Sequence, residues 1–287
     1  MTLAAPRPGR HHGGRSIKAD IDATAPPANA IALWYLGQSG FVVKAGGTVL
    51  YLETYMIGRP DHDPRRFTPP LRPDEIDNAD FVFGSHWHYD HIDPPTMKAA
   101  AERSAGARFI VPRCARKALV EIGISTGRFA HVETRLGKIS FTAIPSAHET
   151  LEADPACGYP YWGYLITVNG VTIYHSGDCI PYDGLLERLA GKRVDIAMLP
   201  INGRDYFRLA RGFAGNFTYR EAADLADAIG ADLLVPMHVG MHMANTERPG
   251  ALADYLADRY PYQKYHFMTP GEKVLCLGAA GERALAP

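Results

Sequence analysis

The chain has 287 residues, of which 46% are hydrophobic and 21% are charged, and its formal net charge at pH 7 is −1. A chain of this length and composition can bury a large core, and single α/β domains of this size are ordinary. Its near-neutral charge gives no electrostatic reason to bind nucleic acid, whose capture relies on clustered Lys and Arg, so we expect a small-molecule substrate and no nucleic-acid partner.

Residues 1–30 are expected to form a flexible basic tail, followed by a single domain over residues 31–287. The tail contains several Arg, Pro and Gly and no sustained apolar run, so it does not have the pattern of a signal peptide. No stretch of the sequence approaches the length and apolarity needed to cross a bilayer. We therefore expect a cytoplasmic protein without membrane contact.

The four cysteines are widely spaced and include no Cys-x-x-Cys pair; they are Cys114, Cys157, Cys179 and Cys276. This spacing indicates neither a zinc knuckle nor a disulfide framework, and free thiols are expected. Cys179 is expected to be a small buried filler rather than an additional metal ligand.

The domain is expected to begin with strands over residues 31–55, broken at 37–40 and 45–47, and to continue through a Pro-rich loop over 59–73. The apolar run 79–83 predicts another strand. Directly after it stands a dense group of residues that bind metals: Ser85-His86-Trp87-His88-Tyr89-Asp90-His91.

Neutral imidazole and carboxylate suit zinc, manganese or iron at neutral pH. In an extended segment His86 and His88 project to the same side because side chains alternate, while the following turn lets Asp90 and His91 face a second position. The pattern therefore favours a dinuclear metal site over a polar loop with surface histidines. A helix over residues 94–100 follows, with prolines in its first turn.

The run 139–145 alternates apolar and small polar residues like a half-buried strand, and it leads to His148. Residues 163–168 and 171–175 then flank Asn169-Gly170, which is a strong signal for a two-residue hairpin turn. The second strand of this hairpin leads to Asp178, whose carboxylate can bridge two cations.

His175 lies at the end of the second hairpin strand. We expect it to make an internal hydrogen bond rather than to take part in catalysis.

A buried strand over 194–199 is followed by a loop that contains Asn202 and Arg204. A guanidinium at this edge can grip a phosphate or carboxylate, so Asn202, Arg204 and Asn216 are the candidate substrate-binding residues. The alternative for Arg204 is an ion pair with Asp205 or Glu149 that holds loops together. Asn216 could equally cap the turn before the next helix.

Residues 218–221 form a capping box that predicts a helix ending near Gly230, and the short buried strand 231–237 ends at His238. Helices outside two central sheets give an α/β fold, an αββα four-layer sandwich of two mixed β-sheets packed face to face. The proposed ligands divide into His86, His88 and His148 for one metal and Asp90, His91 and His238 for the other, with Asp178 between them.

The order of these motifs, a His-x-His-x-Asp-His loop, a later His, a Gly-Asp and a last His, resembles the metallo-β-lactamase superfamily over about residues 31–245. Further segments resemble its L-ascorbate-6-phosphate lactonase branch. They are residues 34–40, 91–94, 144–149, 174–178, 199–204, 215–218 and 236–238. The resemblance implies the fold of that superfamily, a homo-oligomer and a phosphorylated sugar acid as substrate.

Glu53 departs from the pattern of this family, because it stands where the resemblance implies an Asp-Pro pair. Trp87 and Tyr89 place bulky rings inside the ligand loop, and Val239-Gly240 follows the last His in place of Tyr-Asp. These departures are expected to concern the substrate rather than the metals.

The predicted function is that of a metal-dependent hydrolase. Two divalent ions, zinc or manganese and in principle iron, lower the pKa of a shared water, and the metal-bound hydroxide attacks a lactone or related ester. Asp90 is the expected catalytic residue, orienting the water and passing its proton to the leaving oxygen. The alternative is a metal-dependent phosphodiesterase or nuclease of the same fold. A non-catalytic metal-binding scaffold is disfavoured because all seven ligands are present.

Overall fold

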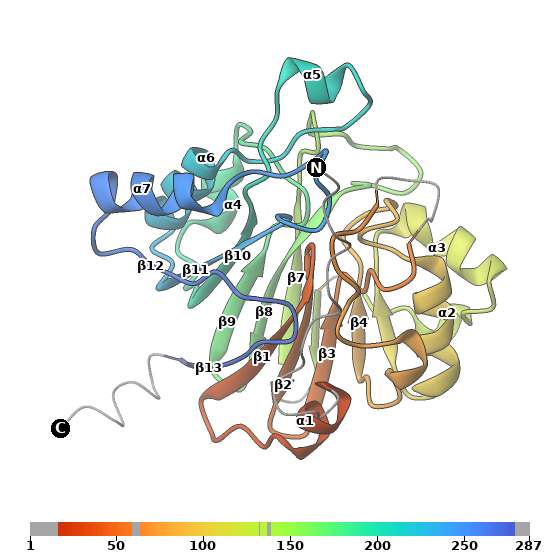
Figure 1. The fold of residues 1–287 in the computed structure, drawn as a ribbon. Coiled ribbons are helices and arrows are strands. Elements are labelled where there is room, and N and C mark those ends of the chain that lie inside the picture. The colour runs from red at the N-terminus through yellow and green to blue at the C-terminus, as the bar shows by residue number, and fades with distance from the viewer. Residues whose placement is uncertain (1–16, 59–63, 132, 137–138, 279–287) are drawn as a thin grey trace, which may run out of the picture.

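Strands that are buried on both faces form the centre of the molecule. The computed structural model describes residues 17–58, 64–131, 133–136 and 139–278. Its strands form two mixed sheets packed face to face, with helices on the two outer sides (Figure 1). The four-layer αββα arrangement expected from the sequence is confirmed.

The first sheet has six strands in the order β13-β1-β2-β3-β4-β5. Neighbours from β13 to β3 are antiparallel, and β3, β4 and β5 run parallel. The strands are β1 (Ala30–Gly37), β2 (Gly40–Ala45), β3 (Thr48–Leu52), β4 (Phe81–Phe83), β5 (Arg108–Ile110) and β13 (Lys273–Leu277). The predicted breaks at residues 37–40 and 45–47 are the turns between β1, β2 and β3.

The second sheet has seven strands in the order β12-β11-β10-β9-β8-β7-β6. Its strands are β6 (Glu133–Leu136), β7 (Ile139–Pro145), β8 (Trp162–Val168), β9 (Val171–His175), β10 (Ile196–Pro200), β11 (Leu233–Met237) and β12 (Lys264–Tyr265). The hairpin predicted at Asn169-Gly170 joins β8 to β9, and both turn residues have positive φ, 49° and 79°. Two such torsions are what a tight hairpin turn requires.

Alternation along each strand divides the apolar side chains between three clusters. In β1, Ile31, Leu33 and Tyr35 face the second sheet, while Ala32 and Trp34 belong to the cluster under the helices of the first sheet. A strand covered on both faces needs apolar residues at every position. This requirement explains why β1 is buried along its whole length.

The helices lie on the outer sides of the sheets (Figure 1). The first sheet is covered by α1 (Ile17–Ala23), α2 (Pro94–Arg103) and α3 (Arg113–Glu121), and the second by α4 (Leu185–Leu189), α6 (Tyr219–Ala228) and α7 (Pro249–Arg259). A short helix, α5 (Tyr206–Leu209), precedes α6. The capping box predicted before α6 is present. In the described ranges, none of the helices is both long and apolar enough to span a membrane.

The expected tail over residues 1–30 is wrong in its second half. Residues 1–16 lie outside the described residues, but α1 begins at Ile17 and packs Ile17 and Ile21 against the outer face of the first sheet. Trp34 Nε1 donates a hydrogen bond of 2.8 Å to Asp20 in the same helix. Two apolar residues one helical turn apart are a weak signal beside so many Pro and Gly, so sequence reasoning missed this helix.

The expectation of four free thiols is also wrong. Cys114, in the first turn of α3, forms a disulfide with Cys157 across 43 positions of sequence, with 5.2 Å between the Cα atoms. Spacing along a chain does not reveal such proximity. Cys179 and Cys276 are free, as expected, and both are buried, as predicted for Cys179.

Candidate metal centre

Every predicted ligand lies in a loop directly after a strand. The segment that begins at Ser85 follows β4, His148 follows β7, Asp178 follows β9 and His238 follows β11. The first loop therefore comes from one sheet and the other three from the second sheet. Packing the sheets face to face brings these loops together, although they are far apart in the sequence.

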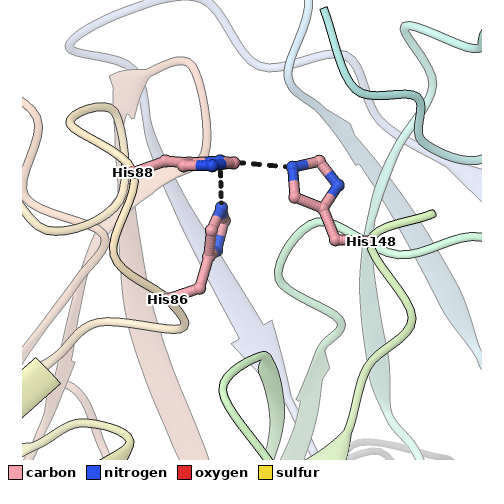
Figure 2. Close-up of side chains that lie close together, drawn as sticks. All are labelled: His86, His88 and His148. Carbon is pink, nitrogen blue, oxygen red and sulfur yellow. Dashed lines mark hydrogen bonds between the residues drawn. The ribbon is translucent and has the colours of Figure 1, made fainter. Parts of the chain in front are cut away.

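The side chains of His86, His88 and His148 bring one ring nitrogen each to a common point (Figure 2). Nε2 of His86 lies 2.9 Å from Nδ1 of His88, and Nε2 of His148 lies 3.2 Å from the same atom. A neutral imidazole offers one lone pair and one N–H, so Nδ1 of His88 cannot serve both neighbours equally. Three converging nitrogens are well suited to a shared cation.

The side chains of Asp90, His91 and His238 form a second group. Oδ2 of Asp90 lies 3.2 Å from Nε2 of His238 and 3.6 Å from Nε2 of His91. These two groups have the membership that the sequence predicts, but His86, His91 and Asp178 form a further possible group that links them.

The carboxylate of Asp178 lies between the two groups. Its Oδ1 is 3.1 Å from Nε2 of His91, and its Oδ2 is 3.3 Å from Nε2 of His238 and 3.7 Å from Nε2 of His148. Nε2 of His91 and Oδ1 of Asp178 are buried and face each other, but neither makes a hydrogen bond of acceptable geometry in the described part of the chain. Buried polar atoms rarely lack partners, and a metal ion would satisfy both. The seven side chains therefore fit divalent metal ions.

Electrostatics supports the same conclusion. Burial lowers the pKa of His148 to about 4 and that of His86 well below its usual value, so both rings are neutral at pH 7, the form that binds metal. Burial alone would also lower the pKa of His238, but the carboxylates of Asp178 and Asp90 outweigh it and raise that pKa to about 9. The centre therefore stabilises positive charge, which a metal would supply.

Glu53 makes hydrogen bonds that orient one predicted ligand and the loop that carries it. It is fully buried, and its Oε2 accepts hydrogen bonds from His91 Nδ1 at 2.5 Å and from Ser85 Oγ at 2.9 Å. Its Oε1 accepts from the Ser85 backbone N–H at 2.8 Å. A carboxylate on Nδ1 fixes the tautomer that leaves Nε2 free for a metal. The expectation that Glu53 concerns the substrate is corrected, because its contacts are with a predicted ligand and the ligand loop.

His175 makes internal hydrogen bonds, as expected from the sequence. Its Nδ1 accepts from the Gly177 backbone N–H at 3.1 Å, and its Nε2 donates to the Ser39 carbonyl at 3.0 Å. These bonds fix the turn that presents Asp178.

The backbone is strained at two residues that are hydrogen-bonded to each other, Gln38 and the predicted ligand His238. Gln38 and His238 have φ angles of 55° and 58°, and the His238 N–H donates to the Gln38 carbonyl at 2.7 Å. The Gln38 side chain donates to Oδ2 of Asp90 at 3.0 Å. Left-handed torsions cost an L-residue roughly 1–2 kcal/mol each. Sequence reasoning missed Gln38, although its place between glycine and serine marks a turn.

A cavity of about 710 Å³ opens over the metal centre. Its floor is formed by predicted ligands, namely His88, Asp90, His148, Asp178 and His238. Aromatic rings form much of its wall, from Tyr55, Trp87, Tyr89, Tyr161 and Phe213. The volume is in the range of small-molecule sites. Trp87 and Tyr89 therefore form part of the wall of this cavity.

The three predicted substrate-binding residues lie elsewhere. Arg204 pairs with Glu221 through contacts of 2.6 and 2.7 Å, and it also donates to the Asn216 carbonyl at 2.9 Å. Asn202 and Asn216 are fully buried and bond to each other at 3.1 Å. None of the three lines the cavity. Their positions favour the structural alternative, although the partner of Arg204 is neither Asp205 nor Glu149.

Further polar side chains of the cavity lining were not predicted from the sequence as substrate contacts. They include Glu149, Glu152, Arg211, His242 and Asn245. These side chains belong to loops, and whether they lie near the predicted ligands depends on how those loops fold, which the sequence pattern does not show.

The family model and the curated relatives that match this sequence all describe related hydrolases or their domain. The sequence model of the Beta-lactamase superfamily domain matches residues 57–239. A UPF0173 metal-dependent hydrolase of Pyrococcus furiosus is 24% identical over 212 residues, which cover 72% of this chain and 84% of the relative. A UPF0173 metal-dependent hydrolase of Nitratidesulfovibrio vulgaris is 28% identical over 251 residues, covering 84% and 93%.

Solved structures of low sequence identity share the fold. Igni18, a metallo hydrolase from Ignicoccus hospitalis, has a TM-score of 0.65 at 21% identity and covers 86% of this chain and 98% of its own. The metallo-beta-lactamase fold protein YhfI from Bacillus subtilis has a TM-score of 0.61 at 15% identity, covering 86% and 99%. An isothiocyanate hydrolase from Delia radicum gut bacteria has a TM-score of 0.69 at 14% identity, covering 86% and 100%.

Proposed function

This chain belongs to the metallo-β-lactamase superfamily, and from that premise we propose that it is a metal-dependent hydrolase that opens a lactone or cleaves a related ester of a phosphorylated sugar acid. The observation that carries the proposal is the convergence of seven predicted ligands, five of which line a cavity of small-molecule size. The names of the curated relatives support hydrolysis. The ester class rests on the sequence segments that resemble lactonases.

The two groups of ligands would hold two divalent ions, with the carboxylate of Asp178 between them. Such ions would lower the pKa of a water molecule and polarise the carbonyl of the scissile bond. His86, His88 and His148 would hold one ion, and Asp90, His91 and His238 the other.

Asp90 is suited to move the proton of the attacking water. Burial would raise the pKa of its carboxyl, but the neighbouring His91 and His238 lower it well below its usual value. The group is therefore ionised at neutral pH and can accept a proton and pass it to the leaving oxygen. Its side chain is 25% exposed on the cavity floor, and Gln38 fixes the orientation of Oδ2.

The cavity wall supports a small, partly polar substrate. Aromatic rings from Tyr55, Trp87 and Tyr161 can cover a sugar-derived ring and exclude bulk water. The carboxylates of Glu149 and Glu152 can accept hydrogen bonds from hydroxyl groups. Opening a lactone in this cavity would yield the corresponding hydroxy acid.

The proposal is tested by elemental analysis together with rates on a panel of lactones, phosphodiesters and phosphorylated sugar acids. We expect His148→Ala to lose bound metal and to slow lactone opening at least about a hundredfold, because it removes one of three nitrogens from a metal position. His266→Ala is the matched control, since His266 is partly exposed and pairs with Glu272. Full metal content and rate in His148→Ala would contradict the assignment.

A further inference from the structure

The segment between β10 and α6 contains three arginines with different surroundings. Arg204 pairs with Glu221, and Arg208 pairs with Asp205 at 2.5 Å. Arg211 is exposed and forms no ion pair with any residue that the structure describes. Its charge is therefore available to a ligand.

Arg211 also lies on the wall of the cavity above the metal centre, together with Phe213. The carbon at the centre of its guanidinium is 5.4 Å from the centroid of the Phe213 ring. This cation–π contact restrains a side chain that would otherwise sample many rotamers. A guanidinium carries a permanent positive charge and a planar set of donors that matches the oxygens of a carboxylate or phosphate.

Apart from His242, the other Asp, Glu and His residues of the cavity lining are two glutamates and members of the candidate metal centre. Glu149 and Glu152 lie on the wall, and Asp90 and Asp178 lie on the floor beside the predicted metal positions. In the part of the chain that the structure describes, Arg211 is the one Lys or Arg side chain that lines this cavity. An anionic group of a ligand would be repelled by the two glutamates and attracted to Arg211.

We propose that Arg211 binds an anionic group of the substrate, a carboxylate or a phosphate, while the ester bond lies on the floor beside Asp90 and Asp178. This inference rests on the proposed hydrolysis and assigns to one residue the recognition of the negatively charged substituent of its ester or lactone substrate. It also transfers to Arg211 the anion-binding role that the sequence suggested for Arg204, whose guanidinium is occupied by Glu221.

The test compares Arg211→Gln with wild type on gluconolactone and gluconolactone 6-phosphate, and on butyrolactone with and without a ring carboxylate. The two pairs distinguish phosphate from carboxylate as the preferred anion. A charge-assisted hydrogen bond lost in this way raises KM for the preferred anionic lactone roughly ten- to hundredfold, and the rates on neutral lactones stay within about twofold. Arg220→Gln is the control, because Arg220 is also an exposed arginine but does not line the cavity.

Binding of 6-phosphogluconate to the metal-loaded protein, measured by calorimetry, separates this proposal from the proposed function. Weaker binding in Arg211→Gln, with partial recovery in Arg211→Lys, supports the anion site. If wild type opens no lactone, the proposed hydrolysis is overturned, but this binding result still supports the anion site. Equal losses on charged and neutral lactones, or equal losses in Arg220→Gln, would overturn the anion site and leave hydrolysis standing.

Discussion

Glu53 lies beneath the ligand loop and orients His91 through a buried hydrogen bond of 2.5 Å. From the sequence it is a departure from a family pattern. In the structure it fulfils a role that requires a carboxylate, because both of its oxygens accept hydrogen bonds from the ligand segment. The residue type was informative, but its position one step after β3 gave no sign of the partner it would meet.

We expect Glu53→Gln to weaken metal binding by roughly ten- to hundredfold. The amide keeps the shape of the side chain, but it can present an N–H to His91 Nδ1, which then no longer donates to a carboxylate. Metal affinity is measured by competition with a chelator of known affinity. Glu102→Gln serves as the control, because Glu102 is exposed at the end of α2. An unchanged affinity in Glu53→Gln would refute this supporting role.

At the scale of elements, a disulfide ties the cavity wall to the opposite layer. The segment between β7 and β8 carries Glu149, Glu152 and Tyr161, all of which line the cavity. Cys157 in this segment is bonded to Cys114 at the start of α3, which covers the first sheet. A segment without helix or strand is thereby fixed to another layer of the molecule at one point.

Loss of this disulfide is expected to lower the free energy of unfolding by about 2–4 kcal/mol, because the bond closes a long loop in the unfolded chain. Urea denaturation of Cys114→Ser/Cys157→Ser against wild type measures the difference. A reducing agent should destabilise wild type and leave the double variant unaffected, since Cys179 and Cys276 are free thiols. Equal stability of the two proteins in oxidising buffer would contradict the expectation.

Local sequence signals were sufficient for several elements. The capping box before α6 and the Asn169-Gly170 turn act through contacts between residues close in sequence, and both are present as predicted. By contrast, α3 and β5 have short or irregular apolar patterns and were not predicted. Their formation depends on packing against the first sheet, which is a contact between distant parts of the chain.

At the scale of the whole molecule, the metal centre joins the two sheets. The ligands from His86 to His91 follow a strand of the first sheet, whereas His148, Asp178 and His238 follow strands of the second. Metal bound at this point would favour the packed arrangement over any state in which the sheets separate. Metal content should therefore determine stability as well as activity.

Removing metal with a chelator is expected to lower Tm by roughly 5–10 °C, because a ligand at a thousandfold excess over its Kd adds about 4 kcal/mol. Scanning calorimetry with and without added zinc or manganese measures the shift. The His148→Ala variant should respond much less than wild type. Identical Tm values for metal-free and metal-loaded wild type would count against a centre that bridges the sheets.

The grouping of the seven candidate ligands could be predicted from the sequence, because residue types that bind metals follow closely after apolar runs. The ends of strands at one edge of two packed sheets lie close together, so their proximity can be predicted without knowing how the loops fold. The polar wall was not predictable in the same way. Arg204 and Arg211 are seven positions apart in the segment between β10 and α6. Their surroundings differ because folding pairs Arg204 with Glu221 and places Arg211 on the cavity wall.

The left-handed torsions of Gln38 and His238 lower the stability of the folded state at a place where side chains contact the candidate metal centre. A glycine at position 38 would adopt the same torsion without steric cost, but it would leave Asp90 without the amide that orients it. The glutamine at this position therefore costs the folded state some stability, and in return it holds Oδ2 of Asp90, the proposed proton acceptor, in one orientation.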